Sequence, residues 1–145
     1  MSLFSVFSVS ASGMAAQRTR AALLAENLAN AETTRTPEGG PYRRKDAVFM
    51  SEPAAGGFSE VFQSALGRTG TGVRVAEVVE DTRDPEKRYQ PGHPDADADG
   101  FVAYPRINPT EDMVDLMGAA RSYQANVAAI SAVKDMIHRS IELLR

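Results

Sequence analysis

An acidic repeat, Asp95-Ala96-Asp97-Ala98-Asp99-Gly100, is the part of the sequence that comes closest to a metal site. It matches the first half of a calcium-binding loop, in which alternate carboxylates ligate the ion. The twelfth position of such a loop needs a bidentate glutamate, and Arg106 stands there. Pro91 and Pro94 also exclude an entering helix. We therefore interpret the repeat as an acidic turn and predict no metal site.

The remaining reactive residue types form no catalytic pattern. His93 lies in a proline-rich turn and His138 near the C-terminus, and neither has a ligand-spaced partner. The chain has no cysteine, no G-x-S-x-G motif and no glycine pattern that cradles a phosphate between a strand and a helix. The sequence thus predicts a protein that is not an enzyme and has no cofactor.

Composition excludes two further classes of protein. The chain has 145 residues with 43% hydrophobic and 24% charged, which suits one domain of ordinary size. Its net charge of −3 argues against nucleic-acid binding through bulk charge. We therefore interpret the basic cluster Arg43-Arg44-Lys45, with Arg35 and Tyr42 nearby, as a solvated face or a docking site for an acidic partner. No apolar run reaches the ~18 residues of a membrane span.

The N-terminus lacks the basic region of a cleavable signal peptide, and Ser5 and Ser8 interrupt its apolar run. We expect either a cytosolic protein or one exported without a cleaved signal.

Three segments organise the chain: 1–32 and 108–145, which are rich in helix formers, and 33–107, which contains most of the prolines and glycines. Asn108 and Pro109 form a helix start, followed by a 3-4 apolar alternation that only Lys134 interrupts. This helix would run roughly 50 Å. A second helix, from about Ser5 to about Ala31, repeats apolar residues every seven positions and is rich in alanine.

The middle segment predicts short strands at 47–50, 73–79 and 101–104, and a short amphipathic helix at 58–66 between glycine-rich connections. The predicted fold class is therefore α+β. The two long terminal helices pack as a coiled-coil-like pair, and a small irregular β-containing domain lies between them.

The C-terminal stripe is wide and contains large residues, whereas the N-terminal helix offers mostly alanine. The N-terminal helix cannot cover that stripe alone, and soluble monomers avoid leaving such surfaces exposed. We therefore expect the terminal helices to pack against other copies or partners. An intramolecular helix pair in a small α+β domain is the alternative.

Several motifs together resemble one known family. The run Thr33 to Lys45, TTRTPEGGPYRRK, is similar to the signature of the FlgC family of bacterial flagellar proximal-rod proteins. Asn27-Leu28-Ala29-Asn30-Ala31 resembles the end of the N-terminal helix in rod and hook proteins. The stretches 84–102 and 108–127 resemble the family's middle domain and C-terminal helix.

The resemblance implies a structural subunit of the flagellar basal-body rod, within the periplasmic space, which transmits torque from the rotor ring to the distal rod and hook. It implies export by the flagellar type III apparatus. The implied partners are other copies of the chain, the rod proteins FlgB and FlgF, and the rod adaptor FliE. A cytosolic coiled-coil adaptor with a basic docking loop is the alternative function.

The expected subunit-interface residues come from the two helices and from the signature segment. They are Phe7, Met14, Ala21, Leu24, Asn27, Leu28, Asn30, Arg35, Tyr42, Arg43, Arg44, Met113, Leu116, Ala120, Tyr123, Val127, Ile130, Ile137, Ile141 and Leu144.

Overall fold

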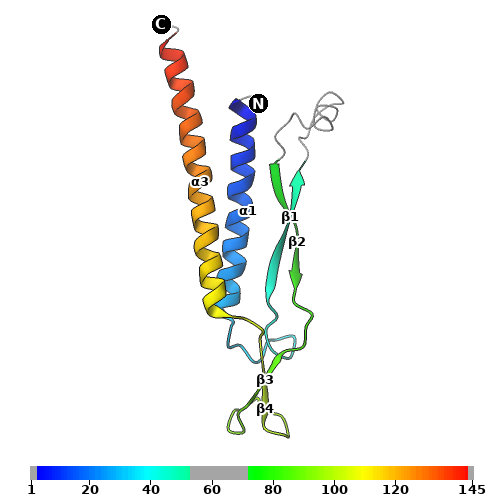
Figure 1. Cartoon of the computed structure of the whole chain (residues 1–145). Coiled ribbons are helices and arrows are strands. Elements are labelled where there is room, and N and C mark those ends of the chain that lie inside the picture. The colour runs from blue at the N-terminus through cyan, green and yellow to red at the C-terminus, as the bar shows by residue number, and fades with distance from the viewer. Residues whose placement is uncertain (1–2, 53–71, 144–145) are drawn as a thin grey trace.

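The computed structural model describes residues 3–52 and 72–143, and its two long helices run antiparallel, side by side (Figure 1). Helix α1 spans Leu3–Ala29 and helix α3 spans Pro109–Glu142. Both chain ends therefore lie at the same end of the molecule, and α3 projects beyond the start of α1 (Figure 1). The predicted α+β fold with a terminal helix pair is confirmed.

The start of α3 forms as the sequence predicts. The Asn108 side chain accepts a hydrogen bond from Thr110 N at 3.2 Å, and Pro109 occupies the first helical position. Glu111 and Asp112 add negative charge to the first turn, where the helix dipole favours it.

Two antiparallel hairpins make up the β structure. Strand β1 (Lys45–Glu52) pairs with β2 (Gly72–Glu80), with an irregularity between Val48 and Phe49. Strand β3 (Glu86–Tyr89) pairs with β4 (Phe101–Tyr104). The sequence predicted β1, β2 and β4 but not β3, because its residues Glu-Lys-Arg-Tyr are all exposed and show no apolar alternation. The predicted helix at 58–66 lies outside the described residues.

Helix α1 is the centre of the fold, because α3 packs on one side of it and the β1–β2 hairpin on another (Figure 1). The Ser12 hydroxyl on α1 accepts a hydrogen bond from Val73 N of β2 at 3.1 Å. Ala16 and Leu24 are buried between these layers. The β3–β4 hairpin lies at the opposite end of the molecule from the termini (Figure 1).

Candidate assembly interface

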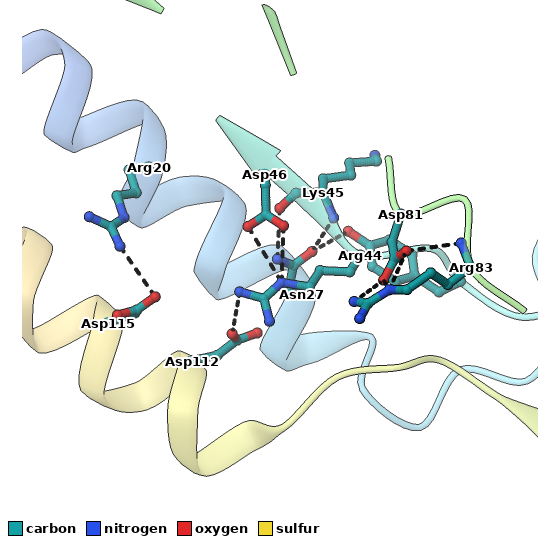
Figure 2. Close-up of polar contacts among 10 residues, drawn as sticks. Arg20, Asn27, Arg44, Lys45, Asp46, Asp81, Arg83, Asp112 and Asp115 are labelled. Atoms are coloured by element: carbon teal, nitrogen blue, oxygen red, sulfur yellow. Dashed lines mark hydrogen bonds and ion pairs between the residues drawn. The ribbon is translucent and has the colours of Figure 1, made fainter. Parts of the chain in front are cut away.

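Asn27 joins the last turn of α1 to the first residue of β1 (Figure 2). Its Oδ1 accepts hydrogen bonds from Lys45 N at 2.9 Å and from the Tyr42 hydroxyl at 3.0 Å. Its Nδ2 donates to the Lys45 carbonyl at 2.9 Å. The side chain is fully buried, so its polar atoms are satisfied only by these bonds. Asn27 therefore closes the loop between α1 and β1.

Tyr42 and Lys45 complete this closure with one acidic neighbour. Lys45 Nζ lies 2.7 Å from Glu26 Oε1, and this hydrogen bond raises the pKa of Lys45. Burial of the ring, with the Glu26 carboxylate nearby, raises the pKa of Tyr42 to about 12. Both groups therefore keep their protons well above neutral pH.

Arg44 extends from the same segment to α3 (Figure 2). Its Nη2 lies 3.0 Å from Asp112 Oδ1, and its Nε lies 3.2 Å from Asp46 Oδ2. The Asp112 side chain is fully buried, and neither of its carboxylate oxygens accepts a hydrogen bond from a described residue. Burial raises the pKa of Asp112, and the Arg44 charge only partly opposes that shift. Arg44 and Asp112 thus form a buried ion pair that links β1 to α3.

A second, exposed ion pair follows β2. Arg83 binds the Asp81 carboxylate through its side chain, and its backbone N–H donates to Asp81 Oδ1 at 3.0 Å. These bonds lower the pKa of Asp81 to about 2. Arg43 Nη1 donates to the Asp81 carbonyl at 2.8 Å, so Arg43 is engaged within the chain.

We call Asn27, Tyr42, Arg44, Lys45 and Asp112 the base cluster. Its contacts connect α1, β1 and α3 at the end of the helix pair remote from the chain termini.

A different kind of surface runs along the helix pair. Two contacts fix which sides of the helices meet: Arg20 Nη2 lies 3.2 Å from Asp115 Oδ2, and a Cβ added at Gly13 would lie 3.1 Å from the Asn126 amide. Successive residues of a helix are about 100° apart around its axis. Given these two contacts, the apolar stripes predicted for α1 and α3 both lie on the same side of the helix pair, away from the β1–β2 hairpin. We call this side the apolar flank; its residues are Phe7, Met14, Ala21, Leu28, Met113, Leu116, Ala120, Tyr123, Val127, Ile130 and Ile141.

Much of the apolar flank is open to solvent. Met113 is 53% exposed, Val127 45% and Phe7 47%. The prediction that the N-terminal helix leaves part of the C-terminal stripe uncovered is thus confirmed. The residues of α3 that are most buried against the rest of the chain are Asp112, Ala119 and Val133, none of which belongs to the predicted set.

The other predicted interface residues differ in how far the chain itself covers them. Leu24, Asn27 and Tyr42 are buried inside the chain, and Arg44 is mostly buried in its ion pair. Asn30 bonds its own helix end, donating from Nδ2 to the Glu26 carbonyl at 2.9 Å. Arg35 is largely exposed, Ile137 is half-buried, and Leu144 lies outside the described residues. A subunit contact by any of them stays a prediction.

The acidic repeat is used in turns of the chain. Asp97 Oδ1 accepts hydrogen bonds from Asp99 N at 3.0 Å and Phe101 N at 2.8 Å, and Gly100 has φ +82°. Asp95 Oδ2 accepts from the Thr34 hydroxyl at 2.8 Å, and His93 Nδ1 accepts from Asp95 N at 3.1 Å. Within the described ranges, no three His, Cys, Asp or Glu residues gather as metal ligands.

A cavity of about 120 Å³ adjoins the base cluster, with Tyr42, Arg43, Asp81, Arg83 and Pro105 in its wall. This volume is below the roughly 300–1,000 Å³ of most small-molecule sites. A second hollow of about 480 Å³, with Glu26, Arg35, Tyr42 and Lys45 in its wall, adjoins the same cluster.

Sequence reasoning missed Asp112 and the Arg20–Asp115 pair. An acidic residue in the first turn of a helix is ordinarily explained by the helix dipole, so Asp112 gave no sign of burial. The available signal was the spacing of Asp112 and Ala119, which are seven residues apart and therefore lie on one face of the helix.

No helix within the part of the chain that the structure describes is both long and apolar enough to cross a membrane. Residues 98–143 match the model of the flagellar basal body rod FlgEFG protein C-terminal family. The chain is 40% identical over 150 residues to the flagellar basal-body rod protein FlgC of Bacillus subtilis, covering 99% of both chains. It is 41% identical to FlgC of Salmonella typhimurium and 37% identical to FlgC of Aquifex aeolicus, and it covers at least 97% of each.

These relatives are structural rod proteins, which agrees with the prediction of a chain that is not an enzyme. Because the likeness extends over nearly the whole of each sequence, the chain belongs to the FlgC family of flagellar basal-body rod proteins.

Proposed function

We propose that the chain builds the proximal rod by packing its apolar flank against neighbouring subunits, and that the rod transmits torque through these contacts. The observation that carries the proposal is the exposure of large apolar side chains of the flank on both helices, such as Phe7 on α1 and Met113 and Val127 on α3. An exposed apolar surface of this kind marks a protein–protein contact in a soluble chain. The partners are other copies of the chain, FlgB, FlgF and FliE, in a rod within the periplasmic space.

The base cluster supports this proposal from inside the chain. A subunit that carries load must hold its helices in a fixed arrangement while its neighbours pull on them. Asn27 and the Arg44–Asp112 pair connect α1, α3 and β1 at one end. We infer that shear on α3 reaches the hairpin through these bonds. Export by the type III apparatus belongs to the same proposal.

The test places a charge on the apolar flank. Val127→Asp leaves the isolated fold intact, because Val127 is 45% exposed, but it buries an unpaired carboxylate in a subunit contact. Such a charge costs several kcal/mol. In a strain whose own copy is deleted, we expect no rods and no swimming with this variant, although the variant is made and exported at normal levels.

Ala132→Asp is the matched control, because Ala132 is exposed on α3 outside the apolar flank. It introduces the same charge and should leave swimming unchanged. Normal swimming with Val127→Asp would contradict the proposal. A wild-type chain that remains in the cytosol and is absent from purified basal bodies would favour the coiled-coil adaptor instead.

A further inference from the structure

Four arginines line the cavity of about 120 Å³ that adjoins the base cluster. They come from three connections that are distant in the sequence. Arg43 and Arg44 precede β1, Arg83 lies between β2 and β3, and Arg106 lies between β4 and α3. Among the described residues of the wall, Asp81 alone is acidic. The wall of this cavity therefore has an excess of positive charge.

Two of the four arginines already have carboxylate partners. Arg83 binds both carboxylate oxygens of Asp81, and its Nε lies 2.9 Å from each of them. The Arg44 guanidinium extends away from that pair and toward Asp112, whose Oδ1 lies 3.0 Å from Arg44 Nη2 (Figure 2). The charges of Arg83 and Arg44 are thus balanced within the chain, and the excess comes from the other two arginines.

Arg43 and Arg106 have no carboxylate partner within the described chain. Arg43 donates from Nη1 to the Asp81 carbonyl, which is a neutral acceptor, and Arg106 makes no hydrogen bond or ion pair with a described residue. The charge of Arg106 nevertheless reaches the cavity. Hydrogen bonds from Arg83 lower the pKa of Asp81 to about 2, and the charge of Arg106 contributes to that shift. Two unbalanced cations therefore meet at one small cavity, where a bound anion would offset their repulsion.

The size of the cavity selects among anions. Its volume of about 120 Å³ is several times the roughly 10–15 Å³ that one water molecule needs, so a compact polyatomic ion fits. The same volume lies below the range of most sites for organic ligands. Pro41, Pro85 and Pro105 stand in the wall and restrict the backbone around the cavity, so little conformational freedom is lost when an ion enters.

We propose that this cavity binds a tetrahedral oxyanion, as inorganic phosphate or sulfate, between Arg43 and Arg106. A guanidinium presents paired N–H groups that match two oxygens of such an ion. The bound ion joins the segment before β1 to the connection between β4 and α3. Because it binds the folded chain and not the unfolded one, it stabilises the fold as its concentration rises. The site belongs to a single chain and does not depend on the rod function.

Calorimetric titration of the purified full-length chain tests the site. In a buffer without other multivalent anions, sodium sulfate and sodium phosphate should each bind saturably, with one ion for each chain. Sodium chloride at matched ionic strength should show no saturable binding. If chloride has the same effect as sulfate, salt merely screens the arginines, and the proposal is overturned.

Arg106→Gln removes one of the two unbalanced cations and breaks no bond within the described chain. It should weaken sulfate binding about ten-fold or more, because a hydrogen bond to a charged group contributes about 1.5–3 kcal/mol. Arg121→Gln is the matched control: it removes the same charge from an exposed position on α3 and should leave the affinity unchanged. Arg106→Lys keeps the charge without the paired N–H groups and should bind sulfate with intermediate affinity. Equal affinities of the wild type and Arg106→Gln would refute the site.

Two further ligands separate the free oxyanion from related anions. Acetate has one charge on a carboxylate and should bind much more weakly than sulfate. Equal affinity for acetate would indicate a site for the carboxylate of a protein partner and would overturn the proposal. Glycerol phosphate should bind more weakly than inorganic phosphate, because the cavity leaves little room for the glycerol. Tighter binding would indicate a phosphate ester and would also overturn the assignment.

Backbone amide NMR locates the ion. Sulfate should shift the resonances of Gly39, Gly40 and Arg106, which line the cavity, and leave that of Gly118, on the exposed side of α3, unchanged. Shifts that spare the cavity would place the ion elsewhere and refute the site. The rod function is tested separately: a wild-type chain that never enters basal bodies would refute that function and leave the oxyanion site intact.

Discussion

The base cluster and the apolar flank use opposite chemistry on the same two helices. In the base cluster, buried polar groups are joined by specific bonds, such as the three hydrogen bonds of Asn27. Along the flank, large apolar side chains such as Met113 and Val127 are half open to solvent. Directional bonds fix one geometry, whereas apolar contacts tolerate small shifts between partners. We infer that the first region sets the shape of the subunit and the second is reserved for its neighbours.

This comparison predicts that the two regions separate stability from assembly. Variants in the base cluster should lower the free energy of unfolding of the isolated chain. Variants on the flank, such as Val127→Asp, should abolish assembly with little effect on that free energy. The following substitutions test this separation, beginning with the largest expected effect.

Asn27→Leu should have the largest effect on stability. It leaves Lys45 N, the Lys45 carbonyl and the Tyr42 hydroxyl without their partner, and each buried unsatisfied group costs about 1–3 kcal/mol. We expect a loss of about 4 kcal/mol, measured by urea unfolding followed by circular dichroism. Asn30→Leu removes two part-buried hydrogen bonds at the helix end, one to the Glu26 carbonyl and one from the Thr33 hydroxyl, and should cost only about 1 kcal/mol. Equal losses in the two variants would show that Asn27 has no special role.

Arg44→Met should cost about 3 kcal/mol at neutral pH, because it leaves the Asp112 carboxylate buried without a counter-charge. Adding Asp112→Asn removes that charge and should recover part of the loss. Because burial already raises the pKa of Asp112, the folded chain binds a proton more readily than the unfolded chain does. Acidification towards pH 4 should therefore reduce the penalty of Arg44→Met. A penalty that does not vary with pH would argue against a buried carboxylate.

Tyr42 makes a prediction at high pH. Its pKa is raised from 10.0 to about 12, so its contribution to stability is complete below pH 10 and is lost as the pH rises through 12. The loss is on the order of 1–2 kcal/mol. Lys45, whose pKa is also raised, changes stability in the same direction. Tyr42→Phe should reduce the fall in the free energy of unfolding at high pH. Tyr89→Phe, at an exposed ring, should leave that fall unchanged.

The sequence predicted those features of the fold that depend on residues close together in the chain. Asn108 and Pro109 mark the start of α3 because capping depends on adjacent residues alone. The heptad spacing of Phe7 and Met14 predicted an apolar stripe, and the structure places that stripe beside the stripe of α3. Val73 and Val75 predicted a strand because alternation is also local.

The sequence could not predict partners that are distant along the chain. The pairing of Arg44 with Asp112 joins residues far apart in sequence. In the sequence alone, a basic cluster fits a docking site as well as it fits an ion pair within the chain. Tyr42 and Arg44 were therefore expected at a subunit interface. Their side chains have partners within the chain, which the sequence did not indicate, and a subunit contact by either residue stays a prediction. Strand β3 was missed because it is exposed, so its pairing with β4 leaves no apolar pattern.

The smallest effect is expected at the helix contact itself. Gly13 lies within α1, and a Cβ there would approach the Asn126 amide group to 3.1 Å. Alanine improves helix propensity by up to about 1 kcal/mol, and the Asn126 amide is the end of a flexible side chain that is able to shift by a few tenths of an ångström. Gly13→Ala should therefore stabilise the isolated chain by about 0.5 kcal/mol, whereas the larger Gly13→Val should destabilise it. If Gly13→Ala is clearly destabilising in urea unfolding, the α1–α3 contact is more rigid than the comparison with the flank implies. Directional packing would then extend from the base cluster along the whole helix pair.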